Sequence, residues 1–147
     1  MDPKTKVLFL CTGNSARCQM AESFLRPYAP ETYEPYSAGL EPTDINPLIR
    51  QVMAEVGHDL SGQWSKSIRE YMGKQHFGYL ITGCDRAEER CPTTFPGIAN
   101  RLHWSFEDPA AFSGSEEERL SKFRDIRDLI STQVPDWIAQ TSGKAAS

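Results

Sequence analysis

Two stretches of the chain share one pattern: a cysteine, five further residues, an arginine and a second cysteine. One runs from Cys11 to Cys18 and the other from Cys84 to Cys91. A cysteine thiolate is a strong nucleophile, and an arginine guanidinium can bind a tetrahedral oxyanion through two parallel hydrogen bonds. Both copies therefore contain groups that could react with an oxyanion, and their surroundings must distinguish them.

The first copy has the composition of an oxyanion-binding loop. Gly13 permits a tight turn, and the backbone N–H groups of such a loop would point inward at the positive end of a following helix. The same field would lower the pKa of Cys11 and make it a thiolate. We expect Arg17 and the loop backbone to hold the anion, although a buried structural thiol at Cys11 is the alternative. The loop residues are Thr12, Gly13, Asn14, Ser15, Ala16, Arg17 and Cys18.

The second copy does not suit an anion, because Asp85, Glu88 and Glu89 would repel it. Cys84 and Cys91 have three interpretations: a redox pair, half of a zinc site, or two inert thiols. A zinc site needs four ligands, and no cluster of two more is evident in the sequence. We therefore expect no bound metal. The histidines available are His58, His76 and His103.

Short apolar runs predict four strands, over residues 7–10, 33–38, 77–82 and 101–106. The first strand leads directly into the loop at Cys11. The third would deliver Cys84 at its carboxyl end. Gly39 is expected to stop the second strand.

Helical spacing predicts helices between the strands. The first follows the loop and ends at Pro27, and the second begins at Asn46-Pro47 and ends at Gly57. A short helix is expected over 67–72. Ser115 and Glu118 form a capping box that opens the last helix. The apolar positions expected to face the core are Met20, Ala21, Phe24, Leu25 and Tyr28 in the first helix; Ile49, Val52, Met53 and Val56 in the second; and Phe123, Ile126, Ile130 and Val134 in the last.

The end of the chain carries two further expectations. Pro135 should kink or interrupt the last helix before Trp137, because proline lacks the N–H that a helix requires. The small, polar tail from Thr141 should be frayed.

Alternating strands and helices predict an α/β fold, a three-layer sandwich whose four-stranded parallel sheet is flanked by helices. Ligands in such sheets bind beyond the carboxyl ends of the strands. Cys11 and Cys84 are both predicted at such ends. The expected site therefore lies at this edge of the sheet.

Composition limits the remaining possibilities. The 147 residues suit one domain, and 39% hydrophobic and 24% charged residues are ordinary for a soluble protein. A net charge of −4 does not favour nucleic acid, and the apolar run from Val7 to Cys11 is too short for a signal peptide or a membrane span. We expect a cytoplasmic protein, a monomer, whose thiols are kept reduced.

The motifs are specific enough to indicate a family. Leu10–Arg17, followed by Gln19-Met20-Ala21-Glu22, resembles the low-molecular-weight tyrosine phosphatase family, and most of all its thioredoxin-coupled arsenate reductase branch. The likeness runs from about Lys4 to about Val134. Further motifs that carry it are Ser37-Ala38-Gly39, Asn46-Pro47 and the stretch from His103-Trp104 to Asp108-Pro109.

The resemblance implies a mechanism for arsenate reduction. Cys11 attacks arsenate while Asp108, the general acid, helps water leave. Cys84 then attacks the Cys11 sulfur and arsenite departs. Cys91 attacks Cys84, and thioredoxin reduces the resulting Cys84–Cys91 disulfide. No cofactor is expected, since the reducing equivalents come from thioredoxin. Phosphate and sulfate should compete with arsenate.

The alternative function is a tyrosine (aryl) phosphatase, which needs only Cys11, Arg17 and Asp108. Ala110-Ala111-Phe112 favours the reductase, because phosphatases of the family usually carry tyrosines there. A non-catalytic binding protein is a third interpretation, and retention of all these groups argues against it. If Asp108-Pro109 forms only a turn, the general acid is lost.

The chain departs from the family at Cys18, where relatives usually have Ser or Thr. A thiol is a weaker hydrogen-bond donor than a hydroxyl, so we expect Cys11 to be less acidified than in relatives. A small buried residue is the favoured interpretation of Cys18. A thiol that traps Cys11 as an off-pathway disulfide is the other.

A second departure concerns potassium. Some relatives bind potassium behind the loop with residues matching Asn14, Glu22 and Ser37, but Lys66 stands where they have an acid. A lysine ammonium could replace the cation by pairing with Glu22. We therefore expect activity that does not depend on potassium, unless Lys66 is only a solvated surface residue.

Overall fold

The computed structural model describes residues 5–11, 17–27, 32–41, 45–60, 62–63, 65–71, 74–82, 98–104 and 113–145. Within these residues, four strands and three α-helices follow one another, with one short 3₁₀ helix. In order they are β1 (Thr5–Cys11), α1 (Arg17–Leu25), β2 (Tyr33–Gly39), α2 (Pro47–Ala54), η1 (Ile68–Glu70), β3 (Phe77–Thr82), β4 (Ile98–His103) and α4 (Glu116–Ala145).

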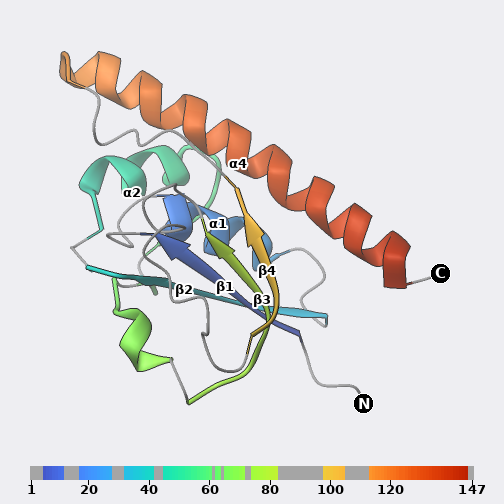
Figure 1. The fold of residues 1–147 in the computed structure, drawn as a ribbon. Helices are drawn as coiled ribbons and strands as arrows, with labels where there is room; N and C mark the ends of the chain where they lie inside the picture. Colours follow the sequence, from blue (N-terminus) through green and yellow to red (C-terminus); the bar gives the residue numbers. More distant parts are fainter. Residues whose placement is uncertain are drawn as a thin grey trace.

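The strands form a parallel sheet in the order β2-β1-β3-β4 (Figure 1). β1 is hydrogen-bonded on both sides, which explains why Val7 to Leu10 form an unbroken apolar run with almost no exposed surface. The predicted four-stranded parallel sheet flanked by helices is confirmed.

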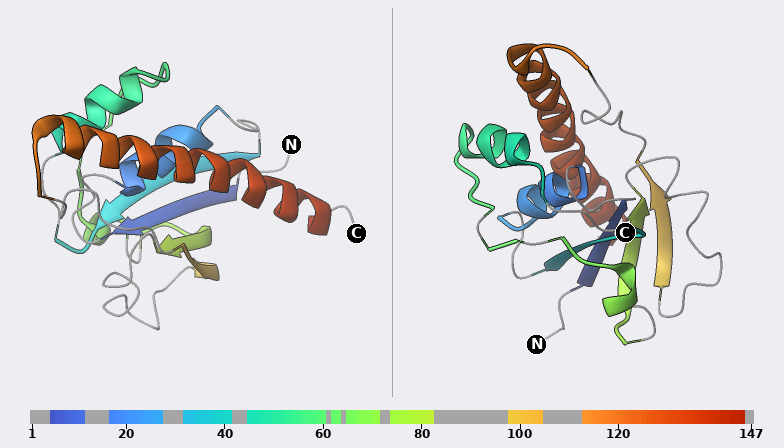
Figure 2. Two further views of the ribbon diagram at one scale, coloured as in Figure 1. Left: turned by 90° about the horizontal axis from the view of Figure 1, so that it is seen from above. Right: turned by 90° about the vertical axis from the view of Figure 1, so that its left-hand side faces the viewer.

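The α-helices cover one face of this sheet. α1 packs on β1 and β2, α4 lies across α1, and α2 contacts α4. The 3₁₀ helix η1 lies on the other side of the sheet from α4 (Figure 2). Tyr36 of β2 and Tyr71 beside η1 are in ring contact, with centroids 5.3 Å apart.

The predicted core positions of α4 are correct. Phe123, Ile126, Ile130 and Val134 are all buried, because their spacing of three or four residues places them on one side of the helix. Ser115 caps the helix as expected, since the Glu118 N–H donates to Ser115 Oγ at 3.1 Å, and the Ser115 hydroxyl also donates to Glu118 Oε1 at 3.1 Å.

Two expectations for α4 are not met. Pro135 lies inside a continuous helix and does not interrupt it. Trp137, just beyond, is 4% exposed and contacts Tyr33 and Tyr79 of the sheet. This packing on both sides of Pro135 holds the helix together despite the missing hydrogen bond. The helix also continues past Thr141 to Ala145.

Three other boundaries differ from the prediction. β4 ends at His103 and not at residue 106, because it stops level with its partner Thr82 of β3. Val56 is 44% exposed, since α2 ends at Ala54 and Gly57 turns the chain with a φ of 82°. The expected short helix over 67–72 is the shorter η1.

Candidate active site

Cys11 is the last residue of β1, at the carboxyl edge of the sheet as predicted. It pairs with Gly39 of β2, and its carbonyl accepts a hydrogen bond from the Leu40 N–H at 3.1 Å. Its neighbour Leu10 pairs with Thr82, the last residue of β3. Cys11 is 3% exposed, and its backbone is held by β2 directly and by β3 through Leu10.

Arg17 and Cys18 begin α1, directly after the loop. Cys18 is 1% exposed, and every residue from it to Leu25 is buried. The first turn of this helix therefore faces the protein interior. Its N–H groups carry the positive end of the helix dipole to the vicinity of Cys11.

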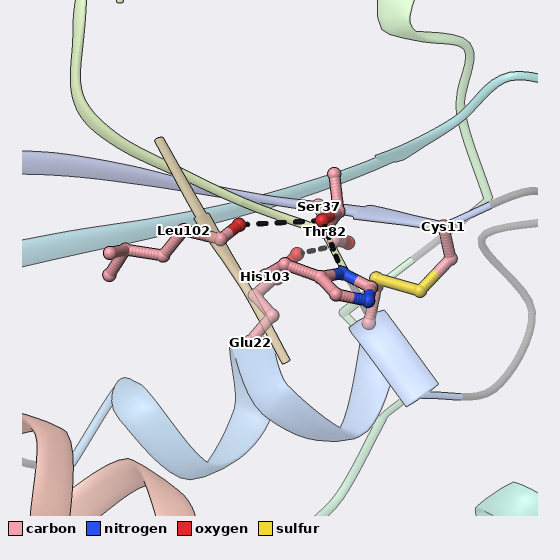
Figure 3. Close-up of a disulfide and its surroundings, with 7 residues drawn as sticks. Cys11, Glu22, Ser37, Thr82, Leu102 and His103 are labelled. Atoms are coloured by element: carbon pink, nitrogen blue, oxygen red, sulfur yellow. Dashed lines mark hydrogen bonds between the residues drawn. A yellow bond between two sulfur atoms is a disulfide. The ribbon is translucent and has the colours of Figure 1, made fainter. Parts of the chain in front are cut away.

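Cys11 and Cys18 are joined by a disulfide (Figure 3). Their Cα atoms are 6.0 Å apart, within the usual range for such a bond. Cys18 is thus buried, as the favoured interpretation expected, and it also forms the bond that the second interpretation described. In this state the Cys11 sulfur cannot attack an oxyanion, so the structure is an oxidised form of the site.

Glu22 lies one helical turn beyond Cys18 and is the centre of a buried polar cluster. Ser37 Oγ of β2 donates to Glu22 Oε1 at 2.6 Å. Arg26 forms an ion pair with the other carboxylate oxygen, and Lys66 Nζ lies 3.9 Å from Oε1. The Lys66–Glu22 pairing that the sequence suggested is present.

Lys66 is buried and not a solvated surface residue, with a side chain 6% exposed. Burial lowers the pKa of Lys66, while the negative charges of Glu22 and Glu70 oppose that shift. The backbone around Lys66 is fixed as well, because its carbonyl accepts from the Gly39 N–H at 2.8 Å. Gly39 is the partner of Cys11 in the sheet, so this segment is attached beside the nucleophile.

Thr82 and His103 form a pair at the same edge that the sequence did not reveal. A hydrogen bond of 2.8 Å joins Thr82 Oγ1 to His103 Nδ1, and Thr82 is fully buried (Figure 3). The sequence had placed His103 in the middle of a strand. Its position at the true end of β4 follows only from the pairing with β3.

Several predicted site residues lie outside the described residues. They are Thr12, Gly13, Asn14, Ser15, Ala16, Cys84, Cys91 and Asp108. Within the part of the chain that is described, no three His, Cys, Asp or Glu side chains are grouped to hold a metal ion. No helix there is long and apolar enough to cross a membrane.

A buried strand that ends in a cysteine and is followed by a helix beginning with arginine defines a phosphatase-like cysteine site. The model of the low molecular weight phosphotyrosine protein phosphatase family matches residues 6–146. The chain belongs to that family. The family resemblance of the Cys11 loop is therefore confirmed.

Within the family, the chain is similar to arsenate reductases. It is 40% identical over 131 residues to an arsenate reductase of Halalkalibacterium halodurans, covering 89% of this chain and 93% of the relative. A solved arsenate reductase in the phosphate-binding state has a TM-score of 0.76 and 31% identity, covering 92% of this chain and 98% of the other. A thioredoxin-dependent arsenate reductase of Corynebacterium glutamicum has a TM-score of 0.72 and 26% identity, covering 97% of this chain and 64% of that one.

Proposed function

We propose that this protein reduces arsenate to arsenite, with Cys11 as the nucleophile and thioredoxin as the source of electrons. The observation that carries the proposal is the position of Cys11. It ends a buried strand, beside the first turn of α1, and is already joined to a second cysteine. A site with oxidisable thiols around its nucleophile suits a reaction that consumes two electrons. The arsenate reductases among the relatives support the same activity.

The reaction begins when the Cys11 thiolate attacks arsenic and water leaves. Arg17 balances the charge of the oxyanion, and Asp108 donates the proton to the departing oxygen. The product is a covalent adduct in which the Cys11 sulfur is bonded to arsenic. Arsenic is still pentavalent in this adduct, so electrons have yet to move.

Reduction requires a second thiol. Cys84 attacks the Cys11 sulfur, the sulfur–arsenic bond breaks, and its electron pair leaves with arsenic as arsenite. Cys91 then attacks Cys84 and frees Cys11. Thioredoxin reduces the Cys84–Cys91 disulfide by the same type of exchange. Thioredoxin dependence in the Corynebacterium glutamicum neighbour supports this last step.

Phosphatase activity is the second candidate, because it needs the same nucleophile and because phosphate and arsenate share shape and charge. The family match supports it. We propose it as a residual activity of the reduced protein. The active enzyme would act in the cytoplasm as a monomer.

Arsenic speciation distinguishes the two activities. Reduced protein is mixed with thioredoxin, thioredoxin reductase, NADPH and arsenate, and arsenite is separated by chromatography and quantified. The same preparation is assayed with an aryl phosphate. The proposal expects catalytic arsenite formation that Cys11→Ser abolishes. Rapid aryl phosphate hydrolysis without arsenite would make the protein a phosphatase.

A further inference from the structure

The Cys11–Cys18 disulfide has no place in the relay described above. We propose that Cys18 is a second resolving thiol: it displaces arsenite from the Cys11 adduct without Cys84 and leaves the disulfide seen in the structure. The inference rests on the proposed arsenate reduction. It adds a catalytic residue at a position where the family usually has Ser or Thr.

Cys18 is held within reach of the reacting sulfur. The two cysteines are seven residues apart in the chain and their Cα atoms are 6.0 Å apart. Cys11 is held by its pairing with Gly39 of β2 and by the pairing of its neighbour Leu10 with β3, and Cys18 lies in a helix whose residues from Cys18 to Leu25 are all buried. The bond joins two ordered elements, so its formation requires neither helix nor strand to unfold.

The side from which Cys18 approaches also suits the reaction. Displacement at sulfur requires the attacking thiolate and the leaving group on opposite sides of the sulfur. Cys18 is 1% exposed and Cys11 3% exposed, and both belong to the hydrophobic core, so Cys18 reaches the Cys11 sulfur within the protein interior. The proposal places the oxyanion on the solvent side of Cys11, opposite Cys18. Cys18 is also in the first turn of α1, directly after Arg17.

The step is balanced without any further reactant. The Cys18 thiolate attacks the Cys11 sulfur, a sulfur–sulfur bond forms, and the sulfur–arsenic bond breaks. The electron pair of that bond stays with arsenic, which goes from the pentavalent to the trivalent state and leaves as arsenite. The two thiols are oxidised to the disulfide, and their protons end on water and arsenite.

The product of this step is shielded from large reductants. Cys11 and Cys18 are 3% and 1% exposed, so a protein thiol cannot reach either sulfur directly. The disulfide therefore stores the oxidising equivalents of one arsenate until a mobile or small thiol attacks it. Cys18 gives the enzyme one turnover of its own, and continued turnover requires the other cysteines.

A single-turnover experiment tests the role of Cys18. The Cys84→Ser/Cys91→Ser variant is reduced, freed of reductant under argon and mixed with excess arsenate. We expect about one arsenite per chain, together with a Cys11–Cys18 disulfide. Trypsin cleaves after Arg17, between the two cysteines, so mass spectrometry detects the disulfide as two linked peptides. Adding Cys18→Ser, the residue type usual in the family, should reduce the arsenite by about tenfold or more.

The outcomes separate this inference from the proposed function. Arsenite from the wild-type protein but none from Cys84→Ser/Cys91→Ser would overturn the role of Cys18 and leave the arsenate reductase intact. Arsenite that is undiminished by Cys18→Ser would also overturn it. No arsenite from the wild type, in the same single turnover, would overturn both proposals. Circular dichroism and urea unfolding of each variant check that it is folded.

Discussion

Lys66 Nζ lies 3.9 Å from Glu22 Oε1, and both side chains are only 6% exposed. Glu22 also accepts from Ser37 and pairs with Arg26, so its carboxylate has three polar partners, two of them positively charged. The ammonium of Lys66 supplies a positive charge beside the Glu22 carboxylate, where the family resemblance suggests a potassium ion in some relatives. This pair connects the segment beside Gly39 to the helix that carries Cys18.

The pair predicts that activity is independent of potassium. Exchanging potassium for sodium at constant ionic strength should leave kcat/KM for arsenate unchanged within about twofold. Lys66→Met removes the ammonium but keeps much of the side-chain volume. The free energy of unfolding of the Lys66→Met variant should fall by about 1–3 kcal/mol, because Glu22 loses a buried cationic partner. The loss is limited because Glu22 keeps Ser37 and Arg26. Lys74→Met, on an exposed residue, is the control. Strong potassium stimulation of the wild type would contradict this account.

The buried disulfide predicts a choice between reductants. In oxidised Cys84→Ser/Cys91→Ser protein, dithiothreitol should regenerate the free Cys11 thiol, whereas thioredoxin should not, because both sulfurs are almost fully buried. Thiol titration after each treatment measures this. Oxidised wild-type protein is the control, and thioredoxin should reduce it. Rapid reduction of the variant by thioredoxin would show that the bond is accessible.

An ion-pair cluster between α2 and α4 predicts a pH-dependent contribution to stability. Hydrogen bonds from Arg124 lower the pKa of Glu55 from 4.5 to about 2, with a smaller contribution from Arg127. A depressed carboxylate pKa stabilises the fold above 4.5, and this contribution is lost as the pH falls from 4.5 towards about 2.

Urea unfolding of the wild type and Glu55→Gln at several pH values tests this. The wild type should be more stable than Glu55→Gln at pH 6. The difference in free energy of unfolding should vanish as the pH falls towards about 2. Added salt should reduce the difference at pH 6, because the pair is exposed to solvent. Asp136→Asn, an exposed position later in α4, is the control for a change of charge. A difference that persists at low pH would mean that Glu55 acts through packing.

Pro135 predicts a stabilising substitution. Pro135→Ala restores a backbone hydrogen bond inside α4, and the loss of proline's rigidity in the unfolded chain only partly offsets this gain. We expect the free energy of unfolding to rise by about 2 kcal/mol, measured with urea. Pro27→Ala lies beyond the end of α1 and should give no such gain. Destabilisation by Pro135→Ala would mean that the ring itself contributes packing.

The sequence predicted the sheet well because its signals are local. The strand limits Phe77–Thr82 and the position of Cys11 at the end of the first strand are correct, since buried parallel strands are continuous apolar runs. The Asn46 cap is also correct, with its side chain accepting from the Leu48 N–H at 2.9 Å. These features depend on residues close together in the chain.

The errors and omissions depend on tertiary structure. The end of β4 is set by its register with Thr82, and the passage of α4 through Pro135 by the packing of Trp137. The sequence favours a small buried Cys18 over a Cys11–Cys18 bond, because the distance between the two cysteines depends on how α1 packs against β1. Periodicity within one segment contains none of this information.

Continuous turnover is the most direct test of the central claim, that arsenate oxidises this protein's thiols and thioredoxin restores them. NADPH oxidation is followed with the protein, thioredoxin and thioredoxin reductase, with and without arsenate. The account predicts arsenate-dependent oxidation that is lost in Cys11→Ser, Cys84→Ser and Cys91→Ser. No arsenate-dependent oxidation by the wild type, or full activity in the Cys84→Ser and Cys91→Ser variants, would contradict it.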